Sequence, residues 1–231
     1  MDNKIYNVIS YLIKFLGWFI KMKTIVVNAS PRKDWNTAKL MKQAQKGAES
    51  VGAETEYIDL YDLNFTGCRS CLICKMKDME RCKCFWKDDL SPLIDKIYEA
   101  DTLIIGIPIY MGEPASQYKA FIERLIFVAL SYDGGNYFEG KINVGLIYTM
   151  NAPKEFYESD YKDKFASFEG LFNFLNGKVE IYPSCNTLQV NDYSKYNMGI
   201  FDEENKIKSN NEQFPIDLEE AFKMGANLSS E

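Results

Sequence analysis

The sequence predicts an α/β domain with a five-stranded parallel sheet and helices on both of its faces. Two continuous apolar runs, Thr24–Val27 and Thr102–Ile109, have the composition of strands that are buried on both faces. Each run is followed by a polar turn and then by apolar residues at helical spacing. Alternating strands and helices indicate right-handed crossovers, and five strands favour the doubly wound order 2-1-3-4-5.

The first half of the chain supplies the next elements. Apolar residues recur at helical spacing from Leu40 onward, and Gly52 is a helix stop. Glu54–Leu60 alternates between polar and apolar residues, which predicts the second strand. A cysteine-rich connection follows. Ser91-Pro92 then opens a helix, because proline is compatible with the first helical turn.

The second half continues the alternation. Its spacing predicts, in order, a helix over Ala115–Leu130, a strand over Ile142–Thr149, a Phe-rich helix that stops at Gly177, a fifth strand over Val179–Tyr182, a polar stretch over Asn191–Gln213 and a final helix over Pro215–Leu228.

The composition of the chain excludes several kinds of catalytic and binding site. The chain has 231 residues with a net charge of −6, which suits one α/β domain and does not favour nonspecific binding of nucleic acid. It contains no histidine, so histidine triads, histidine general bases and histidine metal ligands are excluded. Five of its 6 cysteines fall between Cys68 and Cys84, without a secretion signal. This crowding indicates a reducing compartment, and we expect a cytoplasmic protein.

Residues 1–21 form a separate N-terminal extension, and residues 22–231 form the predicted domain. Tyr6–Ile20 is apolar on one helical face but includes Lys14, so it is shorter and more polar than a membrane span. We expect an amphipathic helix that packs on the domain or on a second subunit. Contact with a membrane surface and a natural start at Met22 are the alternatives.

The segment after the first strand has the features of an anion site. A buried strand, a polar loop and a helix start direct backbone N–H groups and a positive helix dipole to one point. Ser30, Arg32 and Thr37 would complete a phosphate site there. The glycine patterns of dinucleotide and Walker-type loops are absent from this segment. The same residues also suit an ordinary loop with a good helix cap, so the segment by itself leaves both alternatives open.

Position in the sheet adds a second indication. In the order 2-1-3-4-5, ligands bind beyond the carboxyl ends of the strands, at the switch between strands one and three. The loops Ser30–Thr37, Pro108–Gly112 and Met150–Pro153 should therefore meet. Polar turn residues combined with apolar and aromatic side chains suit a flat ring with a phosphate tail. The sequence thus predicts a mononucleotide site.

Cys68, Cys71 and Cys74 are spaced so that one loop can wrap a metal or a cluster. Cys82 and Cys84 are the candidates for a fourth ligand. Free thiols, an iron–sulfur cluster and zinc remain as alternatives, in that order of preference. The distant Cys185 is interpreted as structural.

Five segments in the same order resemble the NAD(P)H-dependent FMN reductase branch of the flavodoxin-like superfamily. The match runs from about Lys23 to the C-terminus. Its pieces are NASPRKDWNTAKL from Asn28, GCRSCLICK from Gly67, CFWKDDLSPL from Cys84, GIPIYMGEPASQYKAFIERL from Gly106 and TLQVNDYSKY from Thr187.

The resemblance implies a flavodoxin-like three-layer sandwich that binds FMN, with NAD(P)H as co-substrate. It implies phosphate contacts from Ser30, Arg32, Asn36 and Thr37; ring contacts from Pro108, Ile109, Tyr110, Met111 and Gly112; and cover for the other side of the ring from Met150 and Asn151. It also implies a homodimer or larger homo-oligomer. No catalytic side chain is assigned, because the flavin itself performs hydride chemistry.

Two departures from the family pattern affect these expectations. Trp35 stands where the family usually has glycine, and an aromatic ring there would crowd the phosphate loop or stack near the ligand. The cysteine segment is similar to that of iron–sulfur flavoproteins, whose fourth cysteine shortly precedes an acidic pair. Cys84 matches that position before Asp88-Asp89, whereas Cys82 matches the expected gap better. Cys68, Cys71, Cys74 and Cys84 are therefore the candidate metal ligands.

Three functions follow from these observations. The leading hypothesis is an FMN-dependent oxidoreductase that passes a hydride from NAD(P)H to a quinone, a nitro- or azo-compound, or a protein. The first alternative is an iron–sulfur flavoprotein that acts as an electron carrier. The second is a non-enzymatic flavodoxin-like module, recruited to a membrane by the N-terminal helix.

Overall fold

The computed structural model describes residues 21–230. The predicted N-terminal helix therefore lies outside the described residues, as does the boundary proposed between it and the domain. No described helix combines the length and the apolar composition that a membrane crossing requires.

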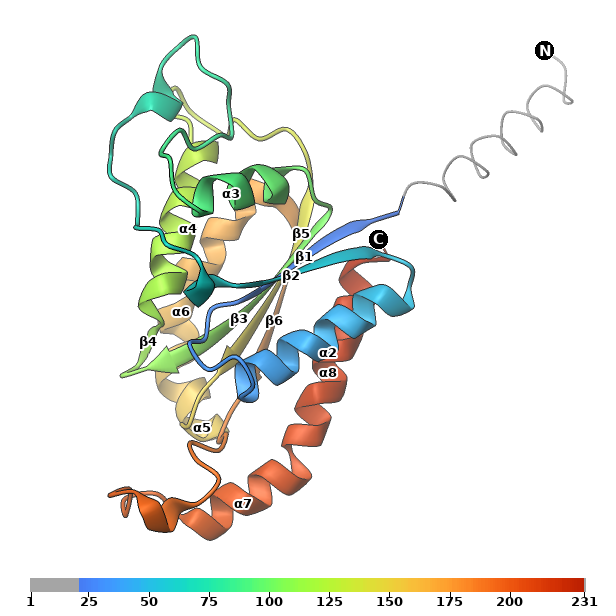
Figure 1. Cartoon of the computed structure of the whole chain (residues 1–231), viewed down its shortest axis with the longest axis vertical. Helices are drawn as coiled ribbons and strands as arrows, with labels where there is room; N and C mark the ends of the chain where they lie inside the picture. Colours follow the sequence, from blue (N-terminus) through green and yellow to red (C-terminus); the bar gives the residue numbers. More distant parts are fainter. Residues whose placement is uncertain (1–20, 231) are drawn as a thin grey trace, which may run out of the picture.

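The sheet has the predicted order. Five parallel strands are arranged β2-β1-β3-β5-β6, which corresponds to 2-1-3-4-5 in the predicted numbering (Figure 1). They are β1 (Lys23–Asn28), β2 (Glu54–Asp59), β3 (Thr102–Tyr110), β5 (Ile142–Thr149) and β6 (Asn176–Ser184). The sequence did not predict the short β4 (Glu113–Pro114), which pairs antiparallel with the end of β3.

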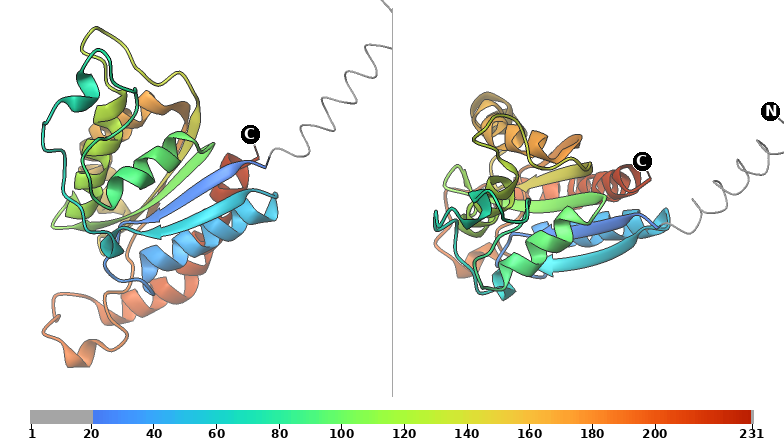
Figure 2. Two further views of the ribbon diagram at one scale, coloured as in Figure 1. Left: turned by 45° about the horizontal axis from the view of Figure 1, so that its top comes forward. Right: turned by 90° about the horizontal axis from the view of Figure 1, so that it is seen from above.

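Helices cover both faces of the sheet and complete the three-layer sandwich (Figures 1 and 2). On one face α2 (Asn36–Ser50) and α8 (Phe214–Leu228) enclose a core that includes Val26 and Ile104. The other face is covered by α3 (Leu90–Tyr98), α4 (Ser116–Ala129) and α6 (Lys162–Glu169) over the larger core. Alternate residues of each central strand therefore serve different cores, which explains the continuous apolar runs.

Helices α2 and α8 cross in close contact because each has a glycine at the crossing. A Cβ atom at Gly225 would lie 1.9 Å from the backbone oxygen of Ala44, and one at Gly47 would lie 1.9 Å from the oxygen of Phe222. Neither partner is a side chain that can move aside. The crossing therefore requires both glycines.

Two predictions about the second half are wrong in detail. Gly177 belongs to β6, where a Cβ atom would lie 1.9 Å from the oxygen of Ile142; close strand approach, and not helix termination, explains this glycine. The Phe-rich helix is divided into α5 (Lys154–Phe156), a π-helical turn (Tyr157–Tyr161), α6 and a 3₁₀ segment (Gly170–Leu175).

The polar stretch before the last helix contains α7 (Glu203–Glu212), which the sequence analysis missed. Few apolar residues occur in it, so its spacing gave no helical signal. Its start has a standard cap, because the Asp202 carboxylate accepts from the N–H of Asn205 at 3.0 Å. The remaining short turns are 3₁₀ segments over Leu60–Asp62, Ile73–Lys75 and Tyr193–Lys195.

The helix crossing predicts the first mutational outcome. Gly225→Ala should destabilise the fold by about 1–3 kcal/mol, because the new methyl group meets backbone atoms of α2. Gly170→Ala is the matched control, since a Cβ atom there meets nothing within 4 Å. Thermal unfolding followed by circular dichroism measures both. Equal melting temperatures for the two variants would contradict the tight crossing.

Candidate functional site

The three loops predicted to meet do meet, in a pocket at the carboxyl edge of the sheet. The pocket has about 380 Å³ of space not filled by atoms, which includes space open to solvent. All of the predicted cofactor residues line it except Met111 and Gly112. The loops meet because β1, β3 and β5 are parallel and all end at the same edge of the sheet.

The start of α2 forms one end of this pocket. The residue before the helix is Trp35, which provides no side-chain cap, and the first turn has no acidic residue. Its N–H groups and its dipole are therefore not neutralised by a capping side chain. Ser30 and Thr37 are buried beside it, and the Ser30 hydroxyl accepts from the N–H of Arg32 at 3.1 Å. This arrangement suits a phosphate.

Trp35 lines the wall and connects the predicted phosphate loop to the far side of the pocket. Its indole Nε1 donates to the Leu188 carbonyl at 3.0 Å. The Arg32 guanidinium lies 4.0 Å from the centre of the indole ring and donates to the Gln189 carbonyl at 2.7 Å. The indole ring therefore packs against Arg32 and the residues that follow β6. It lines the pocket together with Ser30, Asn36 and Thr37 of the same loop.

Thr187, Leu188 and Gln189 form a wall that the sequence analysis did not assign. These residues follow β6, whose carboxyl end lies at the same edge as those of the other strands. The sequence did contain a signal for this wall, because the segment that begins at Thr187 is one of the five that carry the family resemblance.

The turn after β3 is a two-residue hairpin. Tyr110 pairs with Glu113, while Met111 and Gly112 have φ values of 53° and 75°. Positive φ at both central positions is characteristic of a type I′ turn. Met111 is 101% exposed and lies outside the pocket lining. Tyr110 lines the pocket, and burial raises the pKa of its hydroxyl while a hydrogen bond with Ser30 partly offsets that rise.

The loop after β5 is held by a buried lysine of α7. Lys206 is 6% exposed, and its ammonium donates to the Asn151 carbonyl at 2.6 Å and to the Asn186 side-chain oxygen. Burial lowers the pKa of Lys206 to about 8. The unpredicted helix α7 therefore positions one predicted site residue.

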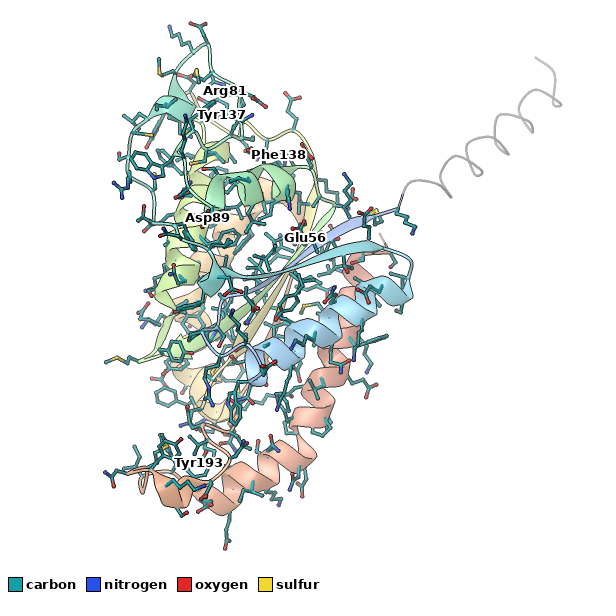
Figure 3. The ribbon with its side chains drawn as sticks, viewed as in Figure 1. Glu56, Arg81, Asp89, Tyr137, Phe138 and Tyr193 are labelled. Atoms are coloured by element: carbon teal, nitrogen blue, oxygen red, sulfur yellow. The ribbon has the colours of Figure 1, made fainter. Side chains whose placement is uncertain are left out.

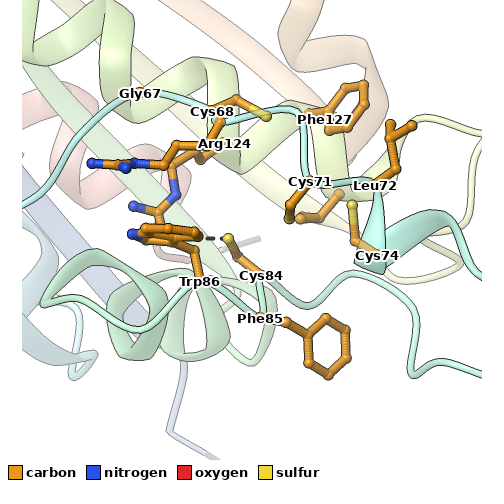
Figure 4. A pocket seen from close by; sticks show the side chains of 12 residues that line it. Gly67, Cys68, Cys71, Leu72, Cys74, Cys84, Phe85, Trp86, Arg124 and Phe127 are labelled. Carbon is orange, nitrogen blue, oxygen red and sulfur yellow. Dashed lines mark hydrogen bonds between the residues drawn. The ribbon is translucent and has the colours of Figure 1, made fainter.

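A second pocket lies in the cysteine segment (Figure 4). Four cysteines line it, namely Cys68, Cys71, Cys74 and Cys84, around about 400 Å³ of space not filled by atoms. The other walls are largely apolar and include Phe127 from α4. Cys82 is not part of this lining. Among residues 21–230, no three Cys, Asp or Glu side chains converge at metal-ion spacing, so the four thiols share a pocket without meeting at one point.

Arg124 of α4 connects this pocket to the fold. The side chain is 2% exposed and pairs with Asp88, while Nη2 donates to Cys84 Sγ at 3.2 Å and to Ser91 Oγ at 2.7 Å. Burial opposes ionisation of Asp88, but the hydrogen bond and charge of Arg124 outweigh it and hold the pKa of Asp88 below its usual value.

Lys75 attaches the outer part of the segment. Its ammonium donates to the Phe127 and Leu130 carbonyls at the C-terminal end of α4, where a cation is favoured by the helix dipole. The Tyr137 ring lies 5.3 Å from this ammonium and 4.3 Å from the Arg81 guanidinium. Figure 3 shows Arg81 and Tyr137 close together at the end of the molecule opposite to Tyr193. The segment is thus tied to α4 by cations.

Three thiols are shielded from ionisation. Burial raises the pKa of Cys74, and it raises that of Cys82 to about 11 and that of Cys185 to about 12. Cys185 is buried in the core, away from the cysteine pocket.

The comparison with protein families agrees with this geometry. The model of the family "NADPH-dependent FMN reductase" matches residues 22–154, from the start of β1 to the loop after β5. The chain belongs to this family. The matched region contains every predicted site residue.

Curated relatives include several iron–sulfur flavoproteins. The chain is 34% identical over 124 residues to one from Methanocaldococcus jannaschii, which covers 54% of this chain and 62% of that protein. It is 34% identical over 103 residues to one from Archaeoglobus fulgidus, covering 45% of this chain and 48% of that protein. The chain thus spans about half to three fifths of the length of these relatives.

Solved structures share the fold over most of their length. An NAD(P)H:quinone oxidoreductase from Methanothermobacter marburgensis aligns with a TM-score of 0.68 at 16% identity, covering 90% of this chain and 98% of that one. An FMN-dependent NADH-azoreductase from Bacillus anthracis, in complex with FMN, aligns with a TM-score of 0.61 at 15% identity, covering 90% and 99%. At these identities the likeness establishes the flavodoxin-like fold.

Lys206 gives the site a pH-dependent stability. Its pKa is about 8 in the folded protein against the ordinary 10.5, so the unfolded chain binds the proton more tightly. The free energy of unfolding should therefore rise between about pH 8 and pH 10.5 relative to that of Lys206→Met. Urea titrations across this range measure the difference. Lys208→Met removes an exposed cation from the same helix and is the control; a parallel pH dependence in all three proteins would contradict the assignment.

Proposed function

We propose that the chain is an FMN-dependent oxidoreductase that transfers a hydride from NAD(P)H to a second acceptor such as a quinone, a nitro- or azo-compound, or a protein. One observation supports this most directly. The predicted phosphate loop, the turn after β3 and the loop after β5 surround a single pocket next to an uncapped helix start. Membership of the NADPH-dependent FMN reductase family points to the same cofactor.

The residues of the pocket fit FMN by chemistry and by position. The hydroxyls of Ser30 and Thr37, the N–H groups at the start of α2 and the Arg32 cation would hold the phosphate. Pro108, Ile109 and Tyr110 would pack on the ring, with Met150 and Asn151 on its other side.

The chain's own residues bind and orient in this proposal. When bound, FMN supplies the hydride and electron chemistry. Met150 is buried and Ile109 half-buried, so both would offer apolar surface to the ring. The sequence contains no histidine, and we assign no side chain as a proton donor or acceptor. The acceptor, the choice between NADH and NADPH, and a homo-oligomeric assembly belong to the same proposal.

Arg32 provides the test of the phosphate site. Arg32→Ala should weaken FMN binding roughly 10- to 150-fold, because a hydrogen bond to a charged group contributes about 1.5–3 kcal/mol. Lys33→Ala is the matched control, since Lys33 pairs with Asp62 and does not line the pocket. Quenching of FMN fluorescence gives both affinities. Anaerobic NAD(P)H oxidation with an added quinone then tests turnover.

The outcomes separate the alternatives. Equal FMN affinity in the wild type and Arg32→Ala would remove Arg32 from the phosphate site. Failure of the wild type to bind FMN would favour the non-enzymatic module. Tight binding without NAD(P)H oxidation would favour an electron carrier.

The cysteine pocket favours a second candidate function, that of an iron–sulfur flavoprotein. Four thiols line one apolar pocket, and four cysteine ligands are what a cubane cluster takes, each iron binding one of them. This donor set fits a cluster, and the curated relatives are named iron–sulfur flavoproteins. In this proposal Cys68, Cys71, Cys74 and Cys84 would hold the cluster, which would supply single-electron transfer.

Cys84 and Cys82 distinguish this candidate from free thiols. After anaerobic reconstitution we expect about four irons per wild-type chain, the content of a cubane. Cys84→Ser should lose most of the iron, whereas Cys82→Ser should retain it, because Cys84 lines the pocket and Cys82 does not. Iron, zinc and sulfide assays on the same samples measure this. Full iron in Cys84→Ser would contradict the ligand set, and zinc without sulfide would replace the cluster with a zinc site.

A further inference from the structure

Arg124 is a buried cation in the wall of the cysteine pocket, and its hydrogen bonds are incomplete. It lines the pocket at 2% exposure. Nη1 contacts Asp88 and the Thr66 carbonyl, and Nη2 contacts Ser91 Oγ and Cys84 Sγ. The Nε–H group is also buried but has no partner among the described residues. A buried donor without an acceptor is costly, so this group requires an explanation.

The guanidinium is held in place by groups outside the pocket. Asp88 pairs with it, and the same carboxylate accepts from the N–H of Leu90 at 3.1 Å and of Ser91 at 3.3 Å, at the start of α3. Arg124 itself belongs to α4. The donor therefore stands between two helices of the core, with Asp88 and Ser91 at the start of α3 holding it in place.

We propose that Arg124 is a positioning residue for the cysteine pocket, which orients Cys84 and donates N–H groups to the sulfur atoms of an anionic metal–sulfur centre. This inference rests on the second candidate function above. It explains why Cys84 lies in the lining and Cys82 does not, since only the Cys84 sulfur receives a hydrogen bond from Arg124. It also gives the unpartnered Nε–H an acceptor.

The proposal has a redox consequence. Reduction adds one electron, so the reduced centre is more negative than the oxidised one. A fixed cation and N–H donors at the sulfur atoms stabilise the reduced form more, which raises the reduction potential. Removal of Arg124 should therefore make the potential more negative, which a role confined to folding would not do.

Arg69 offers a matched control in the same pocket. It also lines the pocket, but it is exposed, and its guanidinium lies 4.4 Å from the centre of the Trp86 ring. Its Nε donates to Thr66 Oγ1 at 3.2 Å. Water screens an exposed charge, so its effect on a buried centre should be small.

The test compares reduction potentials in the full-length protein. Wild type, Arg124→Gln and Arg69→Gln are reconstituted anaerobically with iron and sulfide, and FMN, iron and circular dichroism are measured on each sample. Spectroelectrochemical titration of the cluster bands then gives the midpoint potential. We expect a clear negative shift in Arg124→Gln and little change in Arg69→Gln. A wild-type potential in Arg124→Gln with full iron would overturn the proposal, as would equal shifts in both variants.

A second variant separates a loss of stability from the proposed role of Arg124. Arg124→Gln leaves the buried Asp88 carboxylate unpaired, which destabilises the fold. The double variant Arg124→Gln with Asp88→Asn removes both charges. It should still show a negative shift, because the N–H donors to sulfur are lost, but a smaller one than Arg124→Gln, because the lost carboxylate offsets part of the lost cation; alternatively it loses iron while it remains folded. A folded double variant with wild-type iron and potential would overturn the proposal. A wild type that binds FMN but no iron would overturn this inference and the second candidate function, and leave the first proposed function standing.

Discussion

The parallel hydrogen-bonded register of β1, β3 and β5 is the constraint on which the rest of the structure depends. Asn28 lies opposite Gly106, and Pro108 lies opposite Thr149. All three strands point in one direction, so their following loops emerge at one edge. The predicted phosphate loop, the turn after β3 and the loop after β5, which are far apart in sequence, thus form one pocket.

The cysteine segment is held in place by ionic contacts and not by the strand register. It is a long connection between β2 and α3, and it has little regular structure. Partly or fully buried ions hold it, because a buried charge is stable only with its partners in place. Arg124 fixes the Cys84 end, and Lys75 fixes the outer part on the α4 carbonyls. The N–H of Asn64 donates to Asp89 at 2.8 Å and fixes the start.

Helix α4 connects the two pockets. It begins directly after the β3–β4 hairpin that borders the predicted flavin pocket, and it bears Arg124 and Phe127 in the wall of the cysteine pocket. At about 1.5 Å per residue, Ser116 and Arg124 are separated by roughly 12 Å along the helix axis. In a chain that holds both a flavin and a metal–sulfur centre, α4 would therefore lead from the hairpin beside the flavin pocket to the wall of the cysteine pocket.

The sequence by itself determined the parallel sheet, its strand order and the meeting of three loops, because apolar runs and turn residues are local patterns. It did not reveal β4 or α7, because a two-residue strand and a helix with few apolar residues give no periodic signal. It also did not reveal the wall formed by Leu188 and Gln189, which only contacts between distant segments bring to the pocket. The sequence favoured Cys84 over Cys82 for the fourth position in the cysteine pocket, because Cys84 precedes the acidic pair Asp88-Asp89, although Cys82 matches the expected gap better. Only the tertiary structure revealed the contact that distinguishes Cys84 physically, because the buried guanidinium of Arg124, 40 residues away in sequence, reaches the sulfur of Cys84.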